Sequence, residues 1–305
     1  MNTASIYQEG VWFDGENVTD KAFIYTDGNY TQPKDLPPPS GDPNYPPDSL
    51  RGLALFFCAF SIVTAFGFGL WTWFKRSTRV IQASQPFFLY LVCTGVIMVA
   101  ASIIPYSIND KNRNLETEDC SWACTAVLWL LFPGISIVFS ALFTKTYRIN
   151  LIMKNSKKFR RIKVTIRQTL TTMAVMLILN IITLSVMTAK NPPIYVRDTK
   201  TTDSFGRPED TYGYCAYGQM RYLIALGIIN VLILLLSAYQ SWEARKLSTE
   251  FAESQYIFAA LIITLTLFMV AIPVIIMSSS SPKTILFVYS SAILIFCMNI
   301  LLLLF

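Results

Sequence analysis

The chain has 305 residues, of which 53% are hydrophobic and 14% are charged, with a formal net charge of +6. Soluble domains carry about a quarter of charged residues, so this composition excludes an ordinary soluble protein and indicates a membrane protein. The sequence contains no histidine, which removes Ser-His-Asp hydrolysis, histidine-ligated haem and the common zinc hydrolase sites. We therefore expect no enzyme, no cofactor and no metal site.

Residues 1–50 have the composition of an extracellular N-terminal segment. They hold eight acidic residues against two lysines. Two glycosylation sequons begin at Asn17 and Asn29, and these matter only in a segment that enters the secretory lumen. The proline-rich stretch that ends this segment predicts an extended stalk and not a packed domain.

Residues 51–305 form one domain that reads as a membrane bundle. Seven stretches contain no Asp, Glu, Lys or Arg, and each reaches the roughly 20 residues that a helix needs to cross about 30 Å of hydrocarbon. They predict an all-α membrane protein with a seven-transmembrane helix bundle. We place the spans at about residues 52–74, 84–107, 121–148, 167–189, 220–242, 254–278 and 284–305.

The loops give the bundle an orientation. The loops after the first and third spans are rich in Lys and Arg, and the loop after the third span has nine basic residues between positions 145 and 167 and no acid. Basic loops stay in the cytoplasm, so we expect the N-terminus outside and the C-terminus inside. The basic loop is also expected to contact anionic membrane lipid.

Three of the six cysteines lie within spans and three lie at the expected outer face. Cys58, Cys93 and Cys297 are expected to be apolar packing residues. Cys120, Cys124 and Cys215 lie where disulfides persist, so two of them should pair. Within the spans, Asn180, Asn230 and Asn299 are expected to form hydrogen bonds between helices.

Four motifs carry a family resemblance. Residues 80–86 read Val-Ile-Gln-Ala-Ser-Gln-Pro, and residues 124–131 read Cys-Thr-Ala-Val-Leu-Trp-Leu-Leu. Residues 143–149 read Phe-Thr-Lys-Thr-Tyr-Arg-Ile. Residues 238–248 read Ala-Tyr-Gln-Ser-Trp-Glu-Ala-Arg-Lys-Leu-Ser. These stretches resemble the matching places in class C G-protein-coupled receptors, a family that includes the metabotropic GABA-B and glutamate receptors, and the GABA-B type most of all.

The resemblance implies site residues. It pairs Cys124 with Cys215 in a disulfide and leaves Cys120 spare. It places Lys145 and Glu253 in a salt bridge that holds the inactive state. It also makes the basic inner face the surface that meets a heterotrimeric G protein; the residues expected there are Arg76, Arg79, Lys154, Lys157, Lys158, Arg160, Arg161, Lys163, Arg245 and Lys246.

The same resemblance implies a receptor of the plasma membrane that works as a homodimer or heterodimer and has no nucleic-acid partner. Its agonist site would lie in a large outer domain that these residues do not include, so the sequence names no agonist. The competing interpretation is a transporter or channel, but such proteins place ionisable residues or broken helices in mid-span, and the cores of all seven spans here are free of charge. A retinal protein needs a mid-membrane lysine in its last span, and residues 284–305 contain none.

Overall fold

The structure is a computed structural model, and it describes residues 6–8, 11–13, 44–78, 86–110, 117–156, 166–202, 208–247, 253–278 and 281–304. Its helices are α1 (Asp48–Lys75), α3 (Pro86–Ala101), α4 (Ile103–Tyr106), α5 (Thr117–Ser156), α6 (Ile166–Lys190), α7 (Met220–Leu247), α8 (Glu253–Met277) and α9 (Pro282–Leu304). Its strands are β1 (Ile6–Gln8), β2 (Val11–Phe13), β3 (Ile194–Thr202) and β4 (Pro208–Ala216).

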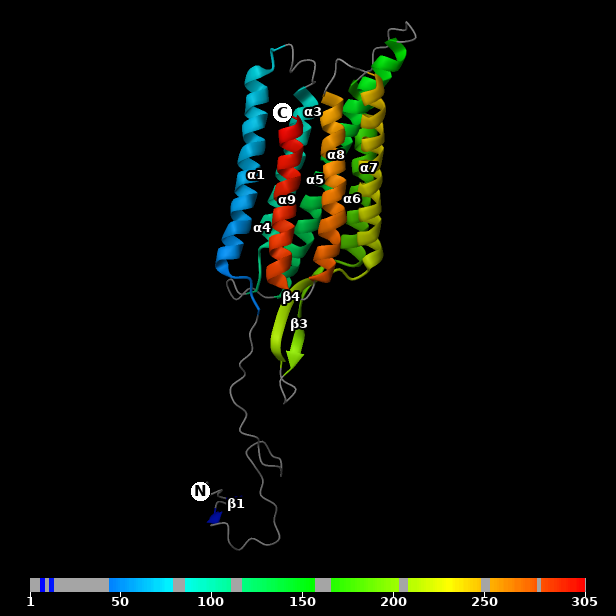
Figure 1. The fold of residues 1–305 in the computed structure, drawn as a ribbon. Helices are drawn as coiled ribbons and strands as arrows, with labels where there is room; N and C mark the ends of the chain where they lie inside the picture. The colour runs from blue at the N-terminus through cyan, green and yellow to red at the C-terminus, as the bar shows by residue number, and fades with distance from the viewer. Residues whose placement is uncertain are drawn as a thin grey trace.

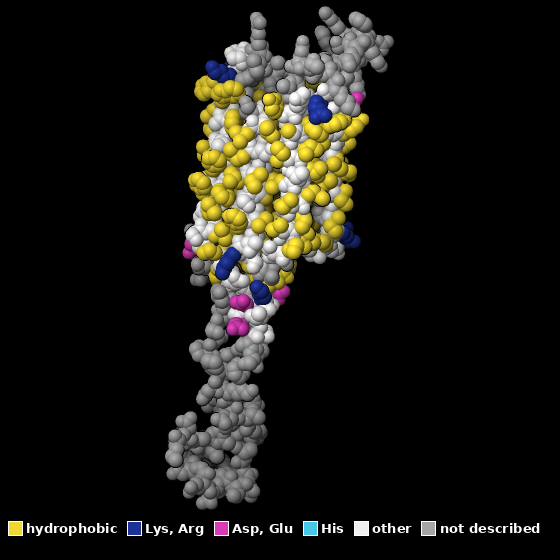
Figure 2. Space-filling model, in the orientation of Figure 1, with side chains coloured by type: hydrophobic (Ala, Val, Ile, Leu, Met, Phe, Trp, Pro, Cys, Tyr) yellow, Lys and Arg dark blue, Asp and Glu magenta, His cyan; other side chains and the backbone are white. Residues whose placement is uncertain are grey.

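The prediction of seven spans is confirmed. Within the described residues, seven helical segments are long and apolar enough to cross a membrane, with α3 and α4 together making the second. Figure 2 shows hydrophobic side chains as a broad band across the visible face of the bundle, with charged side chains near its two ends. Some helices run past the predicted spans, α5 to Ser156 and α7 to Leu247, because a helix can continue beyond the hydrocarbon once its charged side chains reach water.

Prolines explain two local features of the helices. Pro86 and Pro282 occupy the first position of α3 and α9, where no amide donor is needed. Pro105 cannot donate to Ala101, and the second span is interrupted at Ser102 just before it. The Ser102 hydroxyl donates to the Val99 carbonyl at 2.6 Å and lies 2.8 Å from the Tyr289 hydroxyl, so the break is tied to α9.

The helices lie side by side in a bundle (Figure 1), and their contacts form a closed ring in which α5 lies between α3 and α7. Helix α5 packs against α3, α4, α6, α7 and β3, while α8 packs against α7 and α9, and α9 closes the ring on α1. In the most apolar stretch of α5, 67% of the residues are buried, compared with 17% in the most apolar stretch of α6. One core cluster of buried side chains has members from α1, α3, α5, α7, α8 and α9. Helix α5 is therefore the most buried of the described spans.

Two glycines let α3 and α5 approach closely. A Cβ added at Gly134 would lie 2.8 Å from Val99 Cγ2 and 3.0 Å from the Gly95 carbonyl oxygen. A Cβ at Gly95 would lie 2.7 Å from Val138 Cγ2. Association of helices inside a membrane depends on such backbone contact, since lipid is as apolar as the side chains.

The expected interhelical hydrogen bonds of the three asparagines are present. Asn180 on α6 donates to the Ser136 hydroxyl of α5 at 3.2 Å and accepts from Asn230 of α7 at 2.7 Å. Asn299 on α9 donates to the Ala260 carbonyl of α8 at 2.8 Å. These bonds join neighbouring helices because a polar group without a partner is costly in hydrocarbon.

An antiparallel hairpin of β3 and β4 projects from one end of the bundle, the end at which α1 begins and α9 begins (Figure 1). The hairpin lies between the predicted fourth and fifth spans, where no secondary structure was predicted. The chain end of α9 and the end of α5 lie at the opposite side of the bundle. One end of the bundle therefore carries the β3–β4 hairpin, and the other carries the ends of α5 and α9.

Candidate functional site

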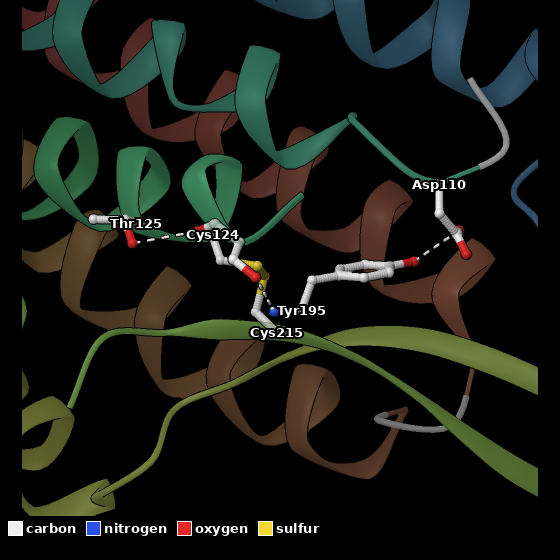
Figure 3. The surroundings of a disulfide bond; sticks show 6 residues. Asp110, Cys124, Thr125, Tyr195 and Cys215 are labelled. Atoms are coloured by element: carbon white, nitrogen blue, oxygen red, sulfur yellow. Dashed lines mark hydrogen bonds between the residues drawn. A yellow bond between two sulfur atoms is a disulfide. The ribbon is translucent and has the colours of Figure 1, made fainter. Parts of the chain in front are cut away.

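A disulfide fastens the hairpin to the central helix. Cys124, in the second turn of α5, is bonded to Cys215 of β4, with the two Cα atoms 5.8 Å apart and a sequence separation of 91 (Figure 3). This is the pairing that the resemblance implied. Closing a loop of this length is worth about 4 kcal/mol in the chain-entropy model. Cys120 lies one turn earlier on α5, is 1% exposed and takes no part in this bond.

The remaining cysteines behave as packing residues. Cys58, Cys93 and Cys297 are each 5% exposed or less, as expected from their place in the spans. Among the described residues no group of three His, Cys, Asp or Glu side chains is arranged to hold a metal ion. The chemistry of the site is therefore built from a disulfide, hydrogen bonds and ion pairs.

Tyr195 makes a second connection between the hairpin and the bundle. It is the cross-strand partner of Cys215, so both side chains stand on the same face of the hairpin. Its backbone N–H donates to the Ser121 hydroxyl at 3.0 Å, and its phenol donates to the Asp110 carboxylate at 3.1 Å (Figure 3). Burial, followed by the charge of Asp110, raises the pKa of Tyr195 above its ordinary value. A Cβ at Gly213 would lie 1.7 Å from the Tyr195 hydroxyl, so a side chain there would displace the Tyr195 phenol from this position.

Arg197 joins three separate segments of the chain. Its guanidinium pairs with the Asp110 carboxylate in the segment after α4. It also donates to the Tyr45 hydroxyl at 2.8 Å, just before α1, and to the Thr211 hydroxyl of β4 at 3.0 Å. The guanidinium carbon lies 4.6 Å from the centre of the Tyr45 ring, within reach of a cation–π contact. Burial lowers the pKa of Arg197, but the hydrogen bond to Tyr45 and the charge of Asp110 outweigh it and the pKa is raised.

We call Tyr45, Asp110, Tyr195 and Arg197 the hairpin hub. Sequence analysis did not single out these residues as a site. The sequence held one usable signal. In an extended strand Tyr195 and Arg197 would lie on one face, as would Thr211, Gly213 and Cys215. What the sequence could not show is that the segment after α4 and the stalk before α1 meet at that face.

The opposite end of α5 carries Lys145. This side chain is only 2% exposed, whereas a lysine at a helix end usually extends to the headgroups. Glu253 is the first residue of α8, but its side chain lies outside the part of the chain that the structure describes. The salt bridge between them therefore stays a prediction.

Two of the predicted G-protein-facing residues are placed. Arg76 is exposed with its guanidinium 4.6 Å from the Trp73 ring centre. Arg245 is exposed and lies 4.3 Å from the ring of Trp242 and 5.5 Å from that of Phe258, on α8. For Lys154 and Lys246 only the backbone is described. The others lie outside the described residues, as do both sequons: Arg79, Lys157, Lys158, Arg160, Arg161, Lys163, Asn17 and Asn29.

Comparisons with known proteins agree with this architecture. A family model described as "7 transmembrane sweet-taste receptor of 3 GCPR" matches residues 46–305. The chain is 25% identical over 187 residues to the human protein "Gamma-aminobutyric acid type B receptor subunit 2", covering 57% of this chain and 19% of that protein. It is 27% identical over 188 residues to "Metabotropic glutamate receptor-like protein G" of Dictyostelium discoideum, covering 60% of this chain and 22% of that protein.

The matched stretches thus span less than a quarter of the length of these curated relatives. The family is one of receptors and not of enzymes, and it does not favour the transporter or channel interpretation. Because the family model covers every span from α1 to α9, the chain belongs to the class C G-protein-coupled receptors, as the seven-transmembrane domain of a multi-pass plasma-membrane protein.

Proposed function

We propose that this domain carries a signal from the hairpin end of the bundle, facing outside, to a heterotrimeric G protein at the basic end, facing the cytoplasm. The observation that carries the proposal is the continuity of α5. This one helix of 40 residues is bonded to the hairpin through Cys124 near its start and bears buried Lys145 near its other end. A displacement of the hairpin is therefore applied directly to the helix that holds the proposed inner restraint.

The orientation follows from charge. The nine basic residues between positions 145 and 167, with no acid among them, follow or overlap the inner end of α5. The positive-inside rule places them in the cytoplasm. They form a surface complementary to an acidic partner and to anionic lipid, whose attraction is worth about 1 kcal/mol per basic residue near the surface. No nucleic-acid partner and no catalytic activity are proposed.

The burial of Lys145 supports its proposed pairing with Glu253. A buried ammonium group is retained only when an opposite charge or hydrogen bonds compensate for lost hydration. Glu253 opens α8 at the same end of the bundle. Breaking such a pair would favour the active arrangement, because a two-state bundle responds to any contact that differs between its states.

Dimerisation is the second part of the proposal. The lipid-facing side of α8 exposes large apolar side chains along its length, with Met269 at 70%, Val270 at 66% and Ile276 at 65% exposure. The resemblance places the active interface of the receptors on this span. A second receptor chain, identical or related, is the proposed occupant.

Basal G-protein activation in cells tests the proposed function. Lys145→Ala and Glu253→Ala are each expected to raise basal signalling above that of the wild type at equal surface expression. The exchanged pair, Lys145→Glu with Glu253→Lys, is expected to return signalling toward the wild-type level because it restores opposite charges. If all four chains reach the surface and none activates any G protein, the proposed function is wrong.

A further inference from the structure

The inner halves of α5 and α7 are joined by a pair of side chains that we call the inner clasp, Asn150 and Gln240. Asn150 is 3% exposed. Its side-chain amide donates to the Gln240 backbone carbonyl at 2.8 Å and to the Gln240 side-chain carbonyl at 2.9 Å. One amide thus makes two bonds to the neighbouring helix where each helix approaches its inner end.

The same stretch of the two helices contains polar atoms that are buried without a partner. Among the described residues, the atoms of this kind include the hydroxyl of Thr144, the side-chain carbonyl of Asn150 and the hydroxyl of Ser241. Thr144 is 1% exposed and Ser241 is fully buried. A buried polar atom without a hydrogen bond favours whichever arrangement hydrates it. The contact between the inner ends of α5 and α7, which we call the inner seam, therefore contains one side-chain pair that holds the helices together. It also contains three buried polar atoms whose hydration would favour separation of the helices.

The seam is fastened differently further into the membrane, three residues before Gln240 on α7 and eleven residues before Asn150 on α5. There the Ser237 hydroxyl donates to the Phe139 carbonyl of α5 at 3.0 Å and to the Ile233 carbonyl of its own helix at 2.7 Å. Ser237 is fully buried and has its hydrogen bonds satisfied. This contact is a natural pivot, so separation of α5 and α7 would be confined to the part beyond it.

From these contacts we propose that the inner α5–α7 seam is a two-position latch. When it is closed, the inner clasp holds the helices together. When it is open, water reaches Thr144, Asn150 and Ser241, and the inner face that would contact the G protein changes shape. Thr144 directly precedes Lys145, so the latch lies beside the proposed salt bridge. Its effect on signalling rests on the proposed function, whereas the opening itself does not.

Water access to position 241 measures the latch without any G protein. Ser241→Cys is introduced into the full chain in inside-out membrane vesicles, and its reaction rate with a membrane-impermeant methanethiosulfonate is followed. The native thiols Cys58, Cys93 and Cys297 are buried, so their background reaction is low. The matched control is Thr72→Cys, another fully buried hydroxyl position near the inner end of α1.

Adding Asn150→Leu should raise the rate at position 241 about fivefold, which corresponds to about 1 kcal/mol, the net worth of an interhelical hydrogen bond in a membrane. Gln240→Met removes only the side-chain acceptor and should give a smaller increase. Thr144→Val removes an unpartnered hydroxyl and should slow the reaction. No change with Asn150→Leu and Gln240→Met, a faster rate with Thr144→Val, or an equal rise at the Thr72→Cys control would each overturn the latch. If the rates change as expected and basal signalling does not, the proposed function fails and the latch stands.

Discussion

Replacing Arg197 by alanine should loosen the hairpin from the bundle. The substitution removes the ion pair with Asp110 and the hydrogen bonds to Tyr45 and Thr211. The side chains of Arg197 and Asp110 are 26% and 20% exposed. A fully exposed pair is worth at most about 1 kcal/mol and a hydrogen bond to a charged group about 1.5–3 kcal/mol, so this partly solvated hub should contribute about 1–2 kcal/mol.

Thermal unfolding of the purified chain in lipid nanodiscs measures this contribution. A loss of about 1–2 kcal/mol in a chain of this size lowers Tm by about 2–3 °C. Arg197→Lys keeps the charge but loses the planar fork that reaches two partners, so it should fall between Arg197→Ala and the wild type. The matched control is Lys200→Ala, an exposed residue three positions further along β3, which should leave Tm unchanged.

A double-mutant cycle tests whether the contact and not the single residue matters. Arg197→Ala and Asp110→Ala together should cost less than the sum of the two single changes, with a coupling of about 1 kcal/mol. Effects that add within about 0.3 kcal/mol would show that the ion pair contributes nothing, and the argument for the hub would be wrong.

Three further predictions concern packing, the disulfide and pH. Gly134→Val should destabilise the bundle by about 1–3 kcal/mol because its side chain has no room against α3; Gly227→Val, at a helix position with open space around it, should cost well under this in the same melt. Cys124→Ser should lower surface expression and shift Tm strongly, since about 4 kcal/mol of loop closure is lost, whereas Cys120→Ser should leave the disulfide intact on a non-reducing gel, and equal loss in both would contradict the pairing. The raised pKa of Tyr195 means that its phenol contributes stability below pH about 10 that is lost as pH rises further, so Tyr195→Phe should flatten the fall of Tm above pH 10; an unchanged slope would refute this.

The features that depend only on the order of residues along the chain could be predicted from the sequence. A span ends where the first charged side chains occur, so the limits of α1 or α9 follow from reading the chain alone. Cys58, Cys93 and Cys297 needed only their place within a span to be assigned to the core. Because Asn180 also lies within a span, its side chain was expected to bond to another helix, although the sequence did not identify the partner residues.

The rest depended on which segments meet in space. The pairing of Cys124 with Cys215 came from the family resemblance and not from spacing, because Cys120 lies one turn away and satisfies the same local rule. No pattern along the chain connects Arg197 with Tyr45, since 151 residues separate them and only the ring of helices brings the stalk beside the hairpin.

The sequence by itself determined that this chain lies in a membrane, how many times it crosses, where each crossing stops and, through four motifs, the family to which it belongs. The tertiary structure alone decided that α5 is the most buried span, that a disulfide joins a hairpin to one end of it, and that Asn150 and Gln240 join it to α7 near the other end. The reason is physical: the bilayer selects residues one at a time by their polarity, whereas a hydrogen bond or disulfide between helices requires two particular side chains to meet at about 3 Å or less.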